Sequence, residues 1–267
     1  MKKIEHLSEI FNFYDTYIID LWGVMHNGIK LNSGALEVVE NLFTQNKRVV
    51  FLSNAPRPSR NVIDFLKKLK MRDGLLKNVL TSGEAALKSL KSEKFGKKFF
   101  HLGPQRDASL FEGMEKKKTS IENCDFILCT GLFDEYENLD FYKNLFKNNF
   151  SKKLICTNPD LTVHRGENEE YCAGKIAEIY NSMGGEVVYF GKPYKDIYEL
   201  FINEKEKNLI IGDNLNTDIK GANNLNIDSL FITDGVHRKN IKKENDLLAL
   251  SKNHKVKIKF FQRELTW

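Results

Sequence analysis

Residues 17–24 read YIIDLWGV, an apolar run that ends in a single aspartate, Asp20. A short run rich in β-branched and aromatic residues predicts a buried strand. Similar apolar runs occur at residues 48–54, 207–214 and 228–235, and helical patterns separate them. Because strands separated by helices pair in parallel, the sequence predicts a doubly wound α/β core whose site lies at the carboxyl ends of the strands.

A second series of β/α units occupies about a hundred residues in the middle of the chain. Its position between the two pairs of core strands predicts a small α/β cap domain inserted into the core. We place the first half of the core at residues 1–82, the inserted cap at residues 83–186 and the second half of the core at residues 187–267. The first residues, MKKIEHLSEIF, predict an amphipathic helix.

The bulk composition limits the classes of partner. A net charge of +5, spread along 267 residues, favours a solvated surface over a nucleic-acid site and suits small anionic substrates. No stretch approaches the ~20 apolar residues that span a bilayer, and the first residues lack the apolar segment of a signal peptide. The four cysteines show no CxxC spacing, which indicates buried free thiols in a reducing compartment. We expect a cytoplasmic protein without nucleic-acid or membrane partners.

Polar residues follow four of the apolar runs. They are Asp20, the pair Ser53 and Asn54, Lys192 within FGKP, and the acids Asp213 and Asp218 within IIGDNLNTD. If these runs are strands of one parallel sheet, all four groups meet at one rim. There they would provide a carboxylate nucleophile, hydroxyl and amide donors, a cation, and acids for a divalent metal. Each group alone is also typical of turns and caps, so the prediction depends on their order and spacing.

The motifs DLWGV, LSNAPR, GKP and GDNLNTDIKGA resemble the four motifs of the haloacid dehalogenase superfamily. More narrowly they resemble class IIA, whose cap is inserted between the second and third motifs and which includes pyridoxal, nitrophenyl and sugar-phosphate phosphatases. The segments TSGEAAL, TNPD and GALEVVENL extend the resemblance over the whole chain. It implies a Rossmann-like core with an α/β cap and a small phosphorylated metabolite as substrate. Caps of this class often form dimers, which leaves a homodimer open.

The resemblance also implies a role for each rim residue. Asp20 would attack phosphorus and form an aspartyl-phosphate. Mg²⁺ would bind Asp20, Asp213 and the backbone carbonyl of Trp22, and Asp218 would brace the metal loop.

Three further groups of the rim, Ser53, Asn54 and Lys192, are implied to contact the transferring phosphoryl group. The first two would donate hydrogen bonds to its oxygens, and Lys192 would neutralise its charge. The cap would close over the site and exclude water. Within it, the loop TNPDLTVHRG supplies the candidate specificity residues Asp160, His164 and Arg165.

Position 22 departs from the family pattern. Family phosphatases have a second aspartate there, which protonates the leaving group and then activates water, whereas this chain has Trp22. An indole donates one hydrogen bond but does not transfer a proton at neutral pH. General acid–base catalysis is worth about 10²–10⁴-fold in rate. A substitute could come from His26, Asp160 or His164.

Three functions therefore remain open. The favoured one is a metal-dependent phosphatase that is slow on alkyl phosphates and better on acyl or aryl phosphates, whose leaving groups need no proton. The second is carbon–halogen hydrolysis, because dehalogenases of the superfamily have an aromatic residue at this position; the two acids of GDNLNTD argue against it. The third is a non-catalytic sensor of phosphate and Mg²⁺, or a partner-binding module, on the same fold.

Overall fold

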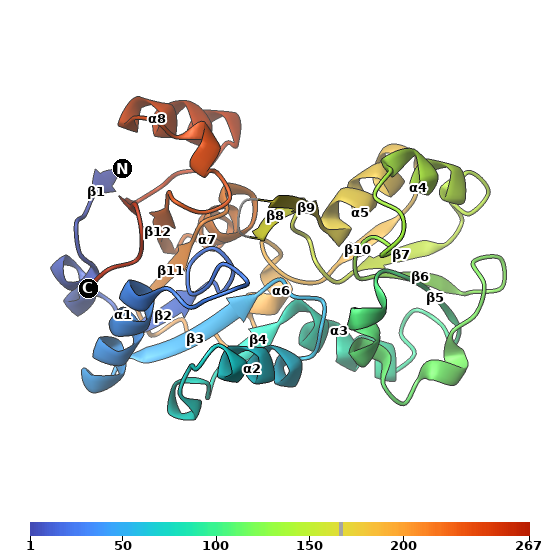
Figure 1. The fold of residues 1–267 in the computed structure, drawn as a ribbon, viewed down its shortest axis with the longest axis horizontal. Coiled ribbons are helices and arrows are strands. Elements are labelled where there is room, and N and C mark those ends of the chain that lie inside the picture. Colours follow the sequence, from blue (N-terminus) through green and yellow to red (C-terminus); the bar gives the residue numbers. More distant parts are fainter. Residues whose placement is uncertain (166–167) are drawn as a thin grey trace.

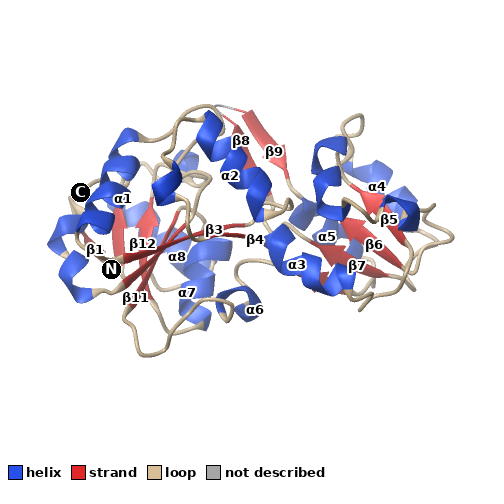
Figure 2. Cartoon of the chain, turned by 90° about the horizontal axis from the view of Figure 1, so that it is seen from below, coloured by secondary structure: helices blue, strands red, loops and turns tan. Residues whose placement is uncertain are grey.

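The computed structural model describes residues 1–165 and 168–267, and it shows two α/β bodies side by side (Figure 1). Each body has its own parallel sheet, and both termini lie on the larger body. A two-stranded hairpin lies between the bodies (Figure 2). Residues 166 and 167, inside the predicted cap range, lie outside the described residues. The predicted α/β fold with an additional smaller sheet is confirmed.

The larger sheet has seven parallel strands in the order β1-β13-β12-β11-β2-β3-β4. The strands are β1 (Lys2–Lys3), β13 (Phe260–Gln262), β12 (Asp228–Ile232), β11 (Asn208–Gly212), β2 (Thr16–Ile19), β3 (Arg48–Ser53) and β4 (Val79–Thr81). Every residue of β2 is buried, as expected for a strand covered on both faces. Asp20 follows β2 directly, so it lies in the middle of the rim.

Helices cover both faces of this sheet. On one face α1 (Ser33–Thr44) and α2 (Ser59–Lys68) pack against Tyr17 and Ile19. On the other face Ile18 packs with α6 (Lys195–Tyr198) and α7 (Lys220–Asn224). The side chains of β2 thus alternate between the two layers, which is the doubly wound arrangement. The remaining core helix is α8 (Glu244–Asn253).

The smaller sheet has four parallel strands in the order β10-β7-β6-β5. They are β10 (Val187–Tyr189), β7 (Lys153–Cys156), β6 (Phe126–Cys129) and β5 (Phe99–Leu102). One face packs against α4 (Leu139–Phe146) and α5 (Ala173–Ser182), and the other against α3 (Ser82–Lys91). The hairpin consists of β8 (Thr162–Arg165) and β9 (Asn168–Tyr171), which are antiparallel. Within residues 1–165 and 168–267, no helix is long and apolar enough to cross a membrane.

The sequence assigned β10 to the wrong sheet. The predicted cap range ended at residue 186, which placed residues 187–189 in the core, but Val187 pairs with Leu154 of β7. The apolar letters VVYF predict a strand without specifying its neighbour. Lys192 therefore reaches the rim from the end of a cap strand and not from a core strand.

The prediction of an N-terminal amphipathic helix is also wrong. Lys2 and Lys3 pair with β13 as an edge strand, and two short 3₁₀ turns follow at Leu7–Glu9 and Phe11–Phe13. The apolar residues of this segment, such as Leu7, are still buried in the core. The spacing of apolar residues identified the buried face but not the backbone conformation.

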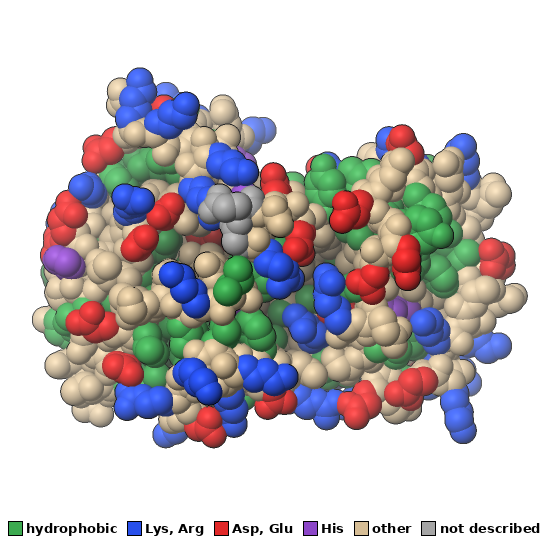
Figure 3. Space-filling model, viewed as in Figure 1, with side chains coloured by type: hydrophobic (Ala, Val, Ile, Leu, Met, Phe, Trp, Pro, Cys, Tyr) green, Lys and Arg blue, Asp and Glu red, His purple; other side chains and the backbone are tan. Residues whose placement is uncertain are grey.

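Charged side chains of both signs are mixed on the face of the molecule that Figure 3 shows. In Figure 3, Lys and Arg alternate with Asp and Glu on both bodies. The sequence prediction of a solvated surface stays a prediction.

Candidate active site

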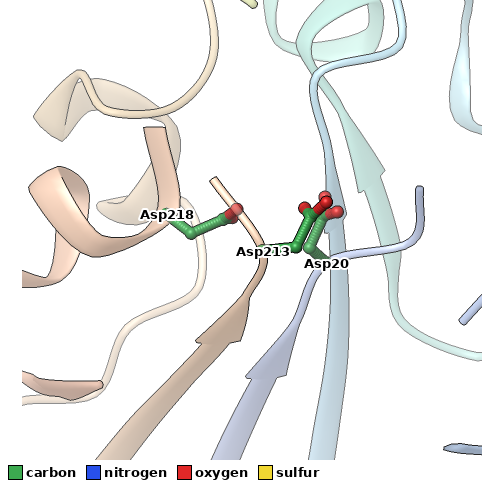
Figure 4. Close-up of side chains that lie close together, drawn as sticks. All are labelled: Asp20, Asp213 and Asp218. Carbon is green, nitrogen blue, oxygen red and sulfur yellow. The ribbon is translucent and has the colours of Figure 1, made fainter. Parts of the chain in front are cut away.

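Three aspartates converge at the rim of the larger sheet, as Figure 4 shows. Asp20 follows β2 and Asp213 follows β11, and their carboxylates lie side by side. Asp218, on the π-helical turn Leu215–Ile219, points toward them. One ligand atom from each of the three buried residues lies within 4.8 Å of the others. Carboxylate oxygens are the ligands that Mg²⁺ prefers, so the donor set fits this ion.

Backbone groups hold the carboxylate of Asp213 in place. The amide of Val236 donates to Oδ2 of Asp213 at 2.7 Å. Gly23, with φ of +88°, and Gly235 both lie so close that a Cβ atom on either would be 2.1 Å from the same oxygen. Glycine at these two positions is therefore a requirement of the site's packing.

Lys192 is the cation of the rim. Its ammonium donates to Oδ1 of Asp20 and, at 2.7 Å, to Oδ1 of Asp218. The side chain is almost completely buried. Burial disfavours its charged form, but the surrounding carboxylates, Asp20 first, outweigh this effect and hold the pKa of Lys192 well above its ordinary value.

Three carboxyl groups and one ammonium meet at the rim. Burial raises the pKa of Asp20 to about 8, although the nearby ammonium of Lys192 favours the carboxylate. Burial and the charge of Asp20 also hold the pKa of Asp213 well above its ordinary value. One ammonium therefore does not fully stabilise the charged forms of three buried carboxyl groups, and a divalent cation would supply further positive charge. This balance is a second reason why the site fits Mg²⁺.

Asn54 fixes the loop that carries Lys192. Its Oδ1 accepts from the backbone amide of Lys192 at 2.8 Å and from the hydroxyl of Ser82 at 3.1 Å, and its Nδ2 donates to the carbonyl of Lys192 at 3.1 Å. Ser53 lies at the end of β3, and its hydroxyl accepts from the amide of Ala55 at 3.2 Å. The structure brings both residues to the rim, and their contact with a phosphoryl group stays a prediction.

Asp160 brings the cap onto the rim. Its Oδ1 accepts hydrogen bonds from the side-chain amides of Asn54 and Asn214, each at 3.2 Å. Burial raises the pKa of Asp160 to about 6, against the lowering effect of Lys192. A cavity of about 1060 Å³ is lined by Asp20 and by all three predicted specificity residues, Asp160, His164 and Arg165.

His164 and Arg165 lie on β8, next to Trp22. The indole nitrogen of Trp22 donates to the carbonyl oxygen of His164 at 2.8 Å, and the Arg165 guanidinium lies 5.1 Å from the centre of the indole ring. The side chain at position 22 is therefore directed to the cap. The role of the Trp22 carbonyl as a metal ligand stays a prediction.

His26 is buried beneath Trp22 and does not fit the role of proton donor. Its Nδ1 accepts from the amide of Gly28 at 3.1 Å, and its ring lies 5.2 Å from that of Trp22. Burial lowers the pKa of His26 to about 4, so the imidazole is neutral at neutral pH. At neutral pH, His26 therefore lacks the protonated form that could donate a proton to a leaving group.

Three residues that contact or support the site were missed in the sequence, although they lie in motifs that it displayed. Asn214, in GDNLNTD, supports Asp160 and donates its backbone amide to Oδ2 of Asp218 at 3.1 Å. Ser82, in TSGEAAL, orients Asn54. Arg57, in LSNAPR, pairs with the buried Asp107 of the smaller body at 3.4 Å. Their positions within motifs were the available signal.

The fold and the rim together define a class of protein, a capped α/β protein with a lysine and a cluster of three acids at the strand ends. Two family models match the chain, a haloacid dehalogenase-like hydrolase at residues 17–117 and a second of the same superfamily at residues 189–253. The chain belongs to the haloacid dehalogenase-like superfamily. The resemblance to its class IIA is confirmed.

Solved structures and curated proteins agree with this assignment. A haloacid dehalogenase-like hydrolase from Brucella suis is 26% identical with a TM-score of 0.86, over 98% of this chain and 100% of that one. A 4-nitrophenylphosphatase from Thermotoga maritima is 27% identical with a TM-score of 0.69, over 94% of each chain. An acid sugar phosphatase from Staphylococcus haemolyticus is 26% identical over 87% of this chain and 90% of its own length. These relatives are phosphatases or hydrolases of the superfamily.

Proposed function

We propose that the protein is a Mg²⁺-dependent phosphatase that hydrolyses the phosphoric monoester of a small metabolite through an aspartyl-phosphate on Asp20. The observation that carries the proposal is the cluster of Asp20, Asp213 and Asp218 around the Lys192 ammonium. The phosphatases among the relatives support the reaction class.

In the first step, a carboxylate oxygen of Asp20 attacks phosphorus and the bond from phosphorus to the leaving oxygen breaks. Mg²⁺, held by Asp20 and Asp213, would offset the repulsion between carboxylate and phosphate. Lys192 keeps Asp20 oriented through its hydrogen bond and adds positive charge beside the phosphoryl oxygens. Asp218, whose two oxygens accept from Lys192 and from the Asn214 amide, acts as the brace.

In the second step, water attacks phosphorus and releases phosphate and free Asp20. Both steps normally use a residue that gives and then takes a proton. Trp22 has no such capacity, and its N–H is already donated to His164. We therefore propose that the preferred substrates are aryl or acyl phosphates, whose leaving groups depart without a proton.

Asp160 is the best candidate for the remaining proton transfer. Asn54 and Asn214 hold one of its oxygens at the rim. With a pKa of about 6, a fraction of Asp160 stays protonated near neutral pH. His26 is neutral and buried, which makes it the weaker choice.

A panel of phosphate esters tests the proposal. With Mg²⁺, we expect aryl and acyl phosphates to be hydrolysed at least about 10-fold faster than alkyl phosphates of similar size, since proton donation is worth about 10²–10⁴-fold to an alkyl leaving group. Chelation by EDTA should stop turnover of all three classes, and added Mg²⁺ should restore it. Equal rates on aryl and alkyl esters would contradict the proposed consequence of Trp22.

A sensor of phosphate and Mg²⁺ is the second candidate function. This function is favoured because Trp22 donates its N–H to the cap and does not transfer a proton. It predicts saturable binding of inorganic phosphate in the presence of Mg²⁺ without turnover of any ester in the panel. A dehalogenase is less well supported, because a cluster of three carboxylates suits a cation that halide release does not need.

A further inference from the structure

Trp22 links the two bodies across the cavity. It follows the core strand β2, and its indole N–H donates to the carbonyl of His164, 142 residues further along the chain on β8, at 2.8 Å. The acceptor is a backbone atom, so this contact fixes the position of the strand itself.

The indole is held firmly on its core side. The turn at residues 27–30 contains Gly28, which contacts the indole. Oδ1 of Asn27 closes this turn by accepting from the amides of Ile29 and Lys30, each at 3.0 Å. Gly28, at φ of +84°, faces the ring so closely that a Cβ atom would lie 2.7 Å from Cη2 of Trp22. The ring of His26 packs edge-on against the indole at 5.2 Å. A ring already packed in this way loses little further freedom when the cap binds it.

The cap side adds a second contact to the same ring. The Arg165 guanidinium lies 5.1 Å from the centre of the indole, a cation–π distance. Glu170, on the paired strand β9, accepts from Nε of Arg165 at 2.8 Å and orients it. One indole therefore makes two independent contacts with β8.

The hairpin depends on such contacts. Among the described residues, β8 and β9 pair with each other and with no strand of either sheet. A two-stranded hairpin is only marginally stable by itself in water. Contacts with the core therefore help to set its position over the rim.

We propose that Trp22 is a positioning residue that holds the β8–β9 hairpin closed over Asp20. Position 22, which carries the proton donor in family phosphatases, is occupied in this chain by a residue that holds the cap in position. Closure excludes water and keeps Asp160 at the rim. The effect of Trp22 on turnover rests on the proposed function, whereas its effect on closure does not.

Hydrogen exchange of the hairpin amides, measured by mass spectrometry on the full chain, tests closure without any turnover. Trp22→Phe keeps an aromatic ring and removes the N–H donor. We expect the amides of β8 to exchange about 3–10-fold faster in this variant, as for the loss of one hydrogen bond. Trp22→Ala also loses the ring contact and should exchange about 2–5-fold faster still.

Two other variants complete the experiment, one as a matched control and one as a second test of the contact. Trp267→Phe changes the chain's other tryptophan, which packs against Phe11 at 5.0 Å, and should leave hairpin exchange unchanged. Arg165→Gln leaves the core untouched and should raise hairpin exchange about 2–5-fold. Hairpin exchange in Trp22→Phe equal to that in Trp267→Phe would overturn the proposal.

The kinetic readout separates this proposal from the phosphatase. If both hold, Trp22→Phe raises KM for an aryl phosphate more than it lowers kcat, because the cap binds substrate less well. If no ester is hydrolysed by any form but hairpin exchange still rises in Trp22→Phe, the phosphatase fails and the positioning role stands. A fall in kcat with unchanged KM and unchanged exchange would overturn the positioning role.

Discussion

The rim of the larger sheet and the β8–β9 hairpin contribute to one cavity, but they are built differently. The rim carboxylates are buried at the ends of parallel strands, and backbone amides or Lys192 bond to them. The hairpin is two short strands, with β9 largely exposed, and contacts the core through Trp22. The larger sheet thus holds the reacting groups in place. The placement of the substrate's leaving group depends instead on the few contacts that hold the hairpin. Changes at the rim should therefore cost more than changes at the hairpin.

The largest effect is expected for Asp20→Asn. The variant keeps the shape of the rim but loses the nucleophile, and turnover of an aryl phosphate should fall by at least about 10³-fold. Asp73→Asn is the control and should keep full activity, because Asp73 is an exposed acid that pairs with Lys67 in the connection preceding β4. Turnover by Asp20→Asn at the level of the control would exclude Asp20 as nucleophile.

The next largest effect concerns the metal. Asp213→Asn should lower turnover about 10²–10³-fold at low Mg²⁺, because a ligand and a charge are lost. Part of the loss should be recovered at high Mg²⁺, which titration of activity against Mg²⁺ would show. An unchanged Mg²⁺ dependence would remove Asp213 from the metal site.

The third effect concerns the pH dependence of the unfolding free energy, which His26 beneath Trp22 should control. The folded state lowers the pKa of His26 from 6.5 to about 4, so His26 contributes stability above pH 6.5 that is lost as the pH falls toward 4. Relative to His26→Phe, the wild type should lose about 3 kcal/mol of unfolding free energy between pH 7 and pH 4. Urea unfolding at several pH values measures this difference. Parallel curves for the two proteins would show that His26 does not titrate in this way.

The smallest effect is expected for Trp22→Asp, which exchanges the hairpin contact for a proton carrier. The ratio of alkyl to aryl phosphate turnover should rise about 10-fold, the low end of general acid catalysis, because the loosened cap offsets part of the gain. Rates on the two ester classes, measured side by side, give this ratio. A ratio equal to that of the wild type would mean that position 22 does not control proton transfer.

The sequence predicted the rim better than the cap for a physical reason. Asp20 and Asp213 follow apolar runs, and parallel strands bring their ends to one edge, so local patterns were sufficient. The sheet of β10 could not be predicted, because VVYF has the same pattern in either body. Lys2 and Lys3 were expected in a helix, and only pairing with a distant strand makes them extended.

The contact of Trp22 could not be predicted either. Its acceptor is a backbone carbonyl 142 residues away, which has no signature in the residue letters. The sequence did reveal that position 22 is unusual, because Trp22 replaces the aspartate of the family pattern.

The most direct test is a rapid acid quench after the protein is mixed with Mg²⁺ and p-nitrophenyl phosphate. Because nothing at position 22 activates water, the aspartyl-phosphate should break down more slowly than it forms. We predict a burst of nitrophenol close to one per protein chain and, by mass spectrometry, a phosphoryl group on the peptide that contains Asp20. Steady turnover without a burst, with Asp20 unmodified at every time point, would contradict the account.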